Sequence, residues 1–171
     1  MKKISLILVT LLLSVSSAFA QKYAFVDTEY ILNNIPSYAA AQEKLDLLSQ
    51  AWEDEISDVY AEVEKMYKDY QNEVVLLSRE AKMRREEEII NREKEAKEIQ
   101  NRYFGVEGEL YTKQQELIQP IQDELYNAVK EIAVEGAYAV IFDTAGGANM
   151  LYTNPKYDVS DEVLEKLGYK N

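Results

Sequence analysis

The chemistry open to this chain is limited first by two residue types that it lacks, since it has no histidine and no cysteine. Histidine is the commonest general base and metal ligand, and cysteine supplies thiolate nucleophiles, disulfides and zinc ligands. What remains is carboxylate chemistry, carried by 31 acidic side chains. No pair of these acids converges on a recognisable site, so the sequence predicts no enzyme, no cofactor and no metal.

Two short motifs could still suggest a ligand, and each has a simpler explanation. Asp143–Gly147 follows an apolar run, as a phosphate-binding loop does, but it has neither the second spaced glycine nor the lysine of such loops. We expect a turn there. Residues 86–88 are three consecutive glutamates, but adjacent helical positions point around a helix rather than to one side. They are a poor chelating set.

Aromatic side chains are the remaining candidates for a functional surface. The chain has 13 tyrosines and one tryptophan, and amphipathic aromatics can make many weak contacts to extended apolar polypeptides. The alternative is that they fill the contact line, or seam, between two helices, which we expect for Trp52 and Tyr70. For Tyr60 and Tyr67 both explanations stay open. The candidate contact residues are Tyr60, Tyr67, Tyr103, Phe104 and Tyr111.

The first twenty residues have the order of a secretory signal peptide. Met1 is followed by two lysines, residues 4–13 are mostly apolar, and residues 14–20 are mostly small and end in Ala-Phe-Ala. The apolar run is short for a bilayer span, which needs about 20 residues, although an uncleaved anchor is the alternative. We therefore expect a mature chain that begins at Gln21 and is exported.

The middle of the chain predicts long helices. No glycine or proline occurs between Pro36 and Gly105, and a single helix of that length would have no core to lie against. The sequence therefore predicts an antiparallel hairpin with its turn between about 76 and 88, and Ser78 as N-cap of the second helix. Apolar residues recur at steps of three or four, the helical period, at Leu45, Leu48, Trp52, Ile56, Val59, Val63, Met66, Tyr70, Val74 and Leu77.

Glycine and proline return in the second half of this helical region. Gly105 and Gly108 should weaken or interrupt the second helix, and Pro120 should kink or restart it.

The two ends of the chain predict short strands. Lys22–Asp27 and Tyr138–Phe142 are apolar β patterns, a third strand is expected at Met150–Thr153, and Ser160 should cap a last helix that ends near Gly168. These ends are too short for an independent core, so we expect copies of the head to associate. The interface candidates are Tyr23, Phe25, Val140, Phe142 and Leu151.

The predicted fold class is mainly α with a small β head and a long antiparallel helical hairpin, a coiled-coil arm. The predicted domains are a signal peptide at 1–20, a β-rich oligomerisation head from 21–36 and 136–171, and a helical arm at 37–135.

The net charge of the chain limits the classes of molecule that it can bind. The formal net charge of −12 argues against nucleic-acid binding, which needs clustered basic residues. Loss of the leader would remove two lysines and no acid, so the mature chain is more acidic still.

The order of these parts resembles the Skp/OmpH family of periplasmic chaperones over essentially all of the mature chain. The segments that carry the resemblance are Tyr23–Asp27, Tyr30–Pro36, Gly136–Asp143 and Val159–Leu164. The resemblance implies a homotrimer with a small β-rich body and helical arms around a cavity that holds unfolded outer-membrane proteins, without ATP. Familiar members have a basic arm surface, whereas this chain is acidic, so lipid contact is not carried over.

Two hypotheses follow for function. The first is an ATP-independent holdase for unfolded outer-membrane proteins. The second is a structural or adaptor coiled coil of the cell envelope that docks one folded partner.

Overall fold

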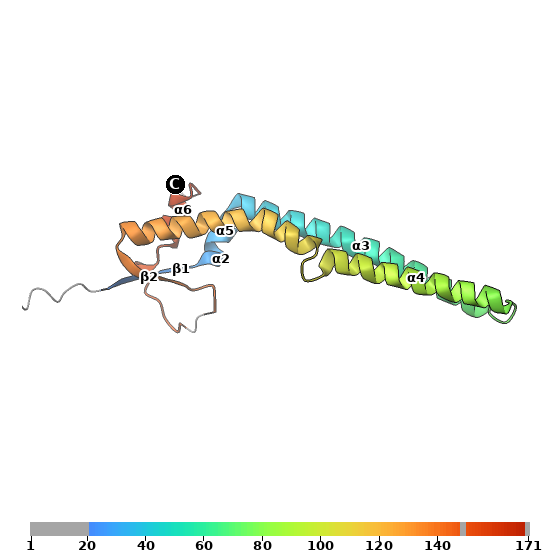
Figure 1. Ribbon diagram of the computed structural model, residues 1–171. Coiled ribbons are helices and arrows are strands. Elements are labelled where there is room, and N and C mark those ends of the chain that lie inside the picture. The colour runs from blue at the N-terminus through green and yellow to red at the C-terminus, as the bar shows by residue number, and fades with distance from the viewer. Residues whose placement is uncertain (1–20, 148–149, 170–171) are drawn as a thin grey trace, which may run out of the picture. The chain divides into compact units, whose positions relative to one another are not determined.

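The computed structural model describes residues 21–147 and 150–169 (Figure 1). The signal peptide expected at residues 1–20 lies outside these described residues. The elements in chain order are β1 (Lys22–Val26), α2 (Thr28–Asn33), α3 (Pro36–Glu73), α4 (Arg79–Phe104), α5 (Glu109–Glu135), β2 (Tyr138–Asp143), the 3₁₀ helix η2 (Pro155–Tyr157) and α6 (Ser160–Lys166). The predicted fold class, mainly helical with a small β head and a long helical hairpin, is confirmed.

The chain divides into two compact units. The arm unit is Ile35–Glu124, and the head unit combines the segment before it with the segment that starts at Leu125. Helix α5 therefore belongs to both units, because it begins at Glu109 and ends at Glu135.

The arm unit is a hairpin in which α3 and α4 lie side by side and run antiparallel (Figure 1). Pro36 occupies the first turn of α3, where a missing backbone N–H costs nothing. The apolar stripe of each helix faces the other and is buried, at Leu45, Val59 and Val63 on α3 and at Ile89, Ala96 and Tyr103 on α4.

The hairpin turn lies at the early edge of the predicted range. Helix α3 ends at Glu73, and α4 begins at Arg79 with the side chain of Ser78 accepting a hydrogen bond from the Ala81 N–H at 3.2 Å. The Ser78 N-cap is thus confirmed. The apolar spacing continues to Leu77, beyond the end of the helix, so periodicity alone could not mark where α3 stops.

The second leg of the hairpin is broken between α4 and α5, as Gly105 and Gly108 predicted. A Cβ atom on Gly108 would lie 2.6 Å from the Tyr103 carbonyl oxygen and 2.9 Å from that of Arg102. No larger residue fits there without a backbone shift. Pro120, by contrast, lies inside α5, which continues past it without restarting.

The head unit contains a parallel two-stranded sheet. Strand β1 pairs with β2, with Tyr23 opposite Val140 and Phe25 opposite Phe142. The other edge of β1 is covered by the chain just before α6, because the Val159 N–H donates to the Phe25 carbonyl oxygen at 2.9 Å.

The third strand expected at Met150–Thr153 is wrong: the described residues there are irregular. The segment before α6 takes the other edge of β1 instead, and the side chain of Leu151 is fully exposed.

The head core forms under the inner face of the sheet. Helices α2 and α6 contact each other, and the buried side chains are Ala24, Val26, Ile31, Val159, Val163 and Leu164. Ser160 does not cap α6 as predicted, since Val159 holds the N-cap position and Ser160 is the first helical residue. Gly168 follows the helix with a φ of 82°, the left-handed conformation expected at such an end.

None of the helices in the described ranges is long and apolar enough to cross a membrane.

Candidate functional surfaces

An aromatic cluster fills the seam of the hairpin close to the break between α4 and α5. Trp52 stacks on Tyr103 with ring centres 4.8 Å apart and planes 9° from parallel, and it meets Phe104 edge-on at 6.3 Å. The Tyr103 hydroxyl donates to the Glu55 carboxylate at 2.8 Å and accepts from Arg102 at 2.9 Å. The hydrogen bond to Glu55 raises the pKa of Tyr103.

This cluster determines how the candidate contact residues are presented. Trp52 lies in the seam, as the apolar spacing predicted. Tyr103 lies there too and is only 8% exposed, and Phe104 beside it is half-buried. Their role as contact residues stays a prediction, and in this structure the most accessible members of the set are Tyr60, Tyr67 and Tyr111.

Further along the hairpin, toward its turn, two adjacent grooves open where α3 meets α4; we call them the tyrosine grooves. The first is lined by Tyr67, Tyr70, Glu86, Ile89, Ile90 and Glu93. The second is lined by Tyr60, Val63, Glu64, Tyr67, Lys68, Gln71 and Glu93. Tyr67 and Glu93 line both grooves, so the two form one continuous apolar and acidic surface.

The tyrosines of these grooves keep much of their ring surface accessible. Tyr60 is 38% exposed and Tyr67 is 49% exposed. Tyr70, expected in the seam, is half-buried at the groove edge, where its hydroxyl donates to the Glu86 carboxylate. That hydrogen bond raises the pKa of Tyr70.

Ion pairs connect α3 to α4 along the hairpin. Arg92 binds Glu62 of the opposite helix and Glu95 of its own helix, each at 2.5 Å. Both hydrogen bonds raise the pKa of Arg92, that to Glu95 more than that to Glu62. Arg85 and Arg102 make similar contacts to acids of α3, at 3.7 and 3.8 Å. Exposed pairs of this kind contribute little individually, about 0–1 kcal/mol.

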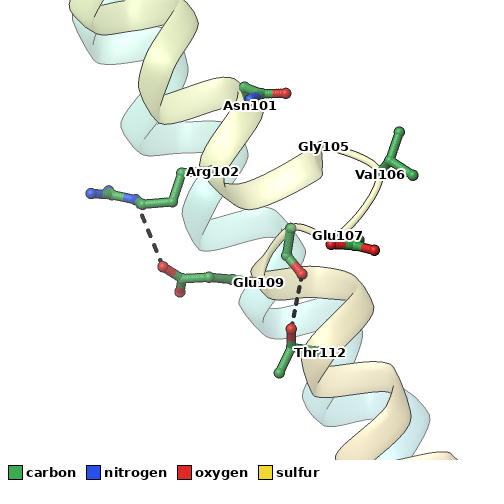
Figure 2. A pocket seen from close by; sticks show the side chains of 8 residues that line it. Asn101, Arg102, Gly105, Val106, Glu107, Glu109 and Thr112 are labelled. Atoms are coloured by element: carbon green, nitrogen blue, oxygen red, sulfur yellow. Dashed lines mark hydrogen bonds and ion pairs between the residues drawn. The ribbon is translucent and has the colours of Figure 1, made fainter.

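A polar hollow marks the α4–α5 connection (Figure 2). Arg102 and Glu109 bridge the break at 3.7 Å, and the Thr112 hydroxyl donates to the Gly108 carbonyl oxygen at 3.2 Å. In Figure 2 the side chain of Val106 points away from both helices, and it is 96% exposed. The residues that line the hollow are thus mainly polar, and the charged ones are Arg102, Glu107 and Glu109.

A second apolar surface lies on the outer face of the head sheet. Tyr23, Phe25 and Phe142 form a chain of ring contacts at 5.9 and 5.8 Å, extended to Tyr157 at 5.5 Å from Tyr23. Val140 shares this face, because it pairs with Tyr23 in the sheet. Four of the five interface candidates therefore lie together, and the fifth, Leu151, is fully exposed in the loop that follows β2.

Comparison with known protein families shows which family this chain belongs to. Residues 22–167 match the model of the family described as outer membrane protein (OmpH-like). The chain belongs to the OmpH-like family. No curated protein sequence matches it at a significant level.

The fold of this OmpH-like chain is also found in a solved structure. It is similar to the crystal structure of a candidate outer membrane chaperone (OmpH-like) from Caulobacter crescentus CB15. The TM-score is 0.67 at 12% sequence identity, and the match covers 86% of this chain and 84% of that one. At this identity the likeness shows the fold alone.

Two of the segments that carry the OmpH-like resemblance end in an aspartate, and both aspartates make hydrogen bonds within the head. Asp27 follows β1 and caps α2 by accepting from the Tyr30 N–H at 2.9 Å. Asp143 ends β2 and accepts from the N–H and hydroxyl of Thr28 at 3.2 and 2.7 Å. Each aspartate therefore ties the end of a strand to α2, and the loop after Asp143 is a turn, as predicted.

Sequence reasoning missed several residues of the tyrosine grooves. Ile90 and Glu93 were not among the candidates, although the adjacent pair Ile89-Ile90 in a highly charged helix was a usable signal. Only one of two neighbouring helical residues can face the seam, and here Ile89 is buried while Ile90 is exposed. Among the described residues, no group of three or more acidic side chains is arranged to hold a metal ion.

Proposed function

We propose that this OmpH-like chain is an ATP-independent holdase that binds unfolded outer-membrane proteins in the periplasm and prevents their aggregation. The observation that carries the proposal is the run of accessible tyrosines on the tyrosine grooves of the arm unit. Membership of the OmpH-like family, and likeness in fold to a protein described as a candidate outer membrane chaperone, support a chaperone role in general.

Self-association through the head is the second part of the proposal. A face carrying Tyr23, Phe25, Val140 and Phe142 would be covered if copies of the head packed against one another. We propose a trimer, with a head from residues 21–36 and 136–171 and an arm from residues 37–135.

The mechanism relies on many weak contacts. An unfolded client that touches one arm meets the others at a high effective concentration, so modest contacts add up to useful avidity. Release needs no ATP, provided that the client gains more by folding or by insertion into a membrane than by staying bound. No catalytic residue and no cofactor takes part.

The direct test is suppression of aggregation. An outer-membrane barrel protein is diluted from urea with and without a threefold molar excess of the mature chain, and light scattering is followed. We expect scattering to fall strongly. Unchanged scattering would refute the holdase, and capture of one folded protein in a fixed ratio, with no affinity for unfolded chains, would favour the adaptor instead.

A pair of substitutions separates client binding from structural packing. Changing Tyr60 and Tyr67 to Ser should weaken client binding more than it lowers the melting temperature, because both rings are partly exposed. The matched control is Trp52→Leu, which alters the buried seam and should lower the melting temperature more than it weakens binding. Equal losses of binding and stability in the tyrosine variant would assign those tyrosines to the seam.

A further inference from the structure

The side chains that line the tyrosine grooves are acidic as well as aromatic. The first groove contains Glu86 and Glu93 and no basic residue, and the second contains Glu64 and Glu93 with a single lysine, Lys68. Lys68 is already paired with Glu64 at 2.5 Å. The grooves therefore present more negative than positive charge around an apolar floor.

Glu93 has the position from which this charge can act on a ligand. It lines both grooves together with Tyr67, and it makes no hydrogen bond or ion pair with any other residue that the structure describes. Tyr67 is half exposed beside it. An aromatic face next to a carboxylate suits arginine or lysine, because the ring attracts a cation over its face while the carboxylate pairs with the charge.

Three nearby cations of the hairpin, Arg85, Arg92 and Lys94, are already paired with other acids. Two basic residues, Arg92 and Lys94, flank Glu93 in sequence. Arg92 is held by Glu62 and Glu95, and Lys94 is paired with Glu98 at 3.6 Å. Arg85 is held by Glu73 and Glu88. A positively charged segment that entered the grooves would meet these arginines already neutralised by their own partners.

We propose that the tyrosine grooves select cationic apolar segments of unfolded polypeptide, with an arginine or lysine side chain lying over Tyr67 and its charge facing Glu93. The apolar neighbours of that cation would lie on the exposed parts of Tyr60 and Ile90. This inference rests on the proposed holdase function, and it specifies which stretches of a client the arm binds first.

The experiment measures peptide affinity with the full mature chain. Three labelled, unstructured peptides share the same tyrosines and leucines and differ only in four positions, which are all Arg, all Gln or all Glu. Fluorescence anisotropy is recorded at about 50 and 300 mM salt. We expect the Arg peptide to bind about tenfold tighter than the Glu peptide at low salt, and the difference to shrink at high salt because exposed charges are screened.

Variants then locate the preference. Glu93→Gln should weaken the Arg peptide about threefold and leave the Gln peptide unchanged, which is the size expected of one exposed ion pair. Tyr67→Leu, which keeps an apolar side chain, should also weaken the Arg peptide more than the Gln peptide. The matched control is Glu43→Gln, which makes the same charge change on an exposed residue near the start of α3 and should change affinity by less than about 1.5-fold.

The outcomes separate this inference from the proposed function. Equal affinities for the Arg and Glu peptides, or equal losses in Glu93→Gln and Glu43→Gln, would overturn the inference while aggregation suppression by the parent chain leaves the holdase standing. Tighter binding of the Glu peptide would overturn it as well. Failure to bind any peptide, together with failure to suppress aggregation, would overturn both.

Discussion

The stacked pair in the hairpin seam gives the sharpest prediction for stability. Trp52 and Tyr103 lie 4.8 Å apart and nearly parallel, and they join α3 to α4 next to the broken α4–α5 connection. We expect the two rings to be energetically coupled. A double-mutant cycle with Trp52→Leu, Tyr103→Leu and the double variant isolates that coupling, because each substitution keeps an apolar side chain in the seam.

The expected magnitude follows from the contacts. An aromatic pair in this geometry contributes about 0.5–1.5 kcal/mol beyond the area that it buries, so the coupling free energy should be about 1 kcal/mol. Tyr103→Leu should lower the free energy of unfolding by more than this coupling, because it also removes the hydroxyl that donates to Glu55. Tyr103→Phe removes only the hydroxyl and should cost about 1 kcal/mol.

The assay is urea unfolding of the mature chain, followed by circular dichroism at 222 nm, which reports the helices. Protein concentration must be held constant, because self-association would shift the apparent stability. In thermal melts a loss of 1 kcal/mol should lower the midpoint by about 2–4 °C. A coupling below about 0.3 kcal/mol, or a Tyr103→Phe cost equal to that of Tyr103→Leu, would show that the stacking contributes nothing.

Three further predictions concern other parts of the arm. Gly108→Ala should destabilise the chain by about 1–3 kcal/mol in urea unfolding, since its Cβ would overlap backbone, whereas Gly146→Ala, with nothing closer than 3.8 Å, should be nearly neutral. Ser78→Ala should cost about 1 kcal/mol by loss of the N-cap, and Ser57→Ala in the exposed interior of α3 should cost nothing. The hydrogen bond to Glu86 raises the pKa of Tyr70 in the folded chain. The stability that this bond contributes should therefore be fully present below about pH 10, the ordinary pKa of tyrosine, and be lost as the pH rises through the higher folded pKa. Tyr70→Phe should flatten that loss in melts recorded at different pH values.

Features set by neighbours in sequence could be predicted without the structure. The helical period identified the hairpin, Ser78 identified the start of α4, and Gly105 with Gly108 identified the break. Each depends on a few consecutive residues, because capping and backbone conformation are local.

Features set by distant contacts could not be predicted. Four-residue spacing along one helix favours a pair between Glu88 and Arg92, but Arg92 binds Glu62 across the hairpin. That choice depends on the register of α3 against α4, which no local spacing encodes. Likewise, Ser160 was expected to cap α6, but its hydroxyl accepts from the Asp27 N–H at 2.8 Å, a contact that spans most of the chain.

The parallel pairing of β1 with β2 has a consequence for how the protein is made. Strand β1 pairs with Tyr138–Asp143, far along the chain, so synthesis must pass β2 before the sheet of the head can form. The helices that lie between are built from local backbone hydrogen bonds and can form first, and pairing of α3 with α4 shortens the loop that the two strands must close. A nascent chain that ends before Tyr138 would therefore carry the arm helices and an unpaired β1.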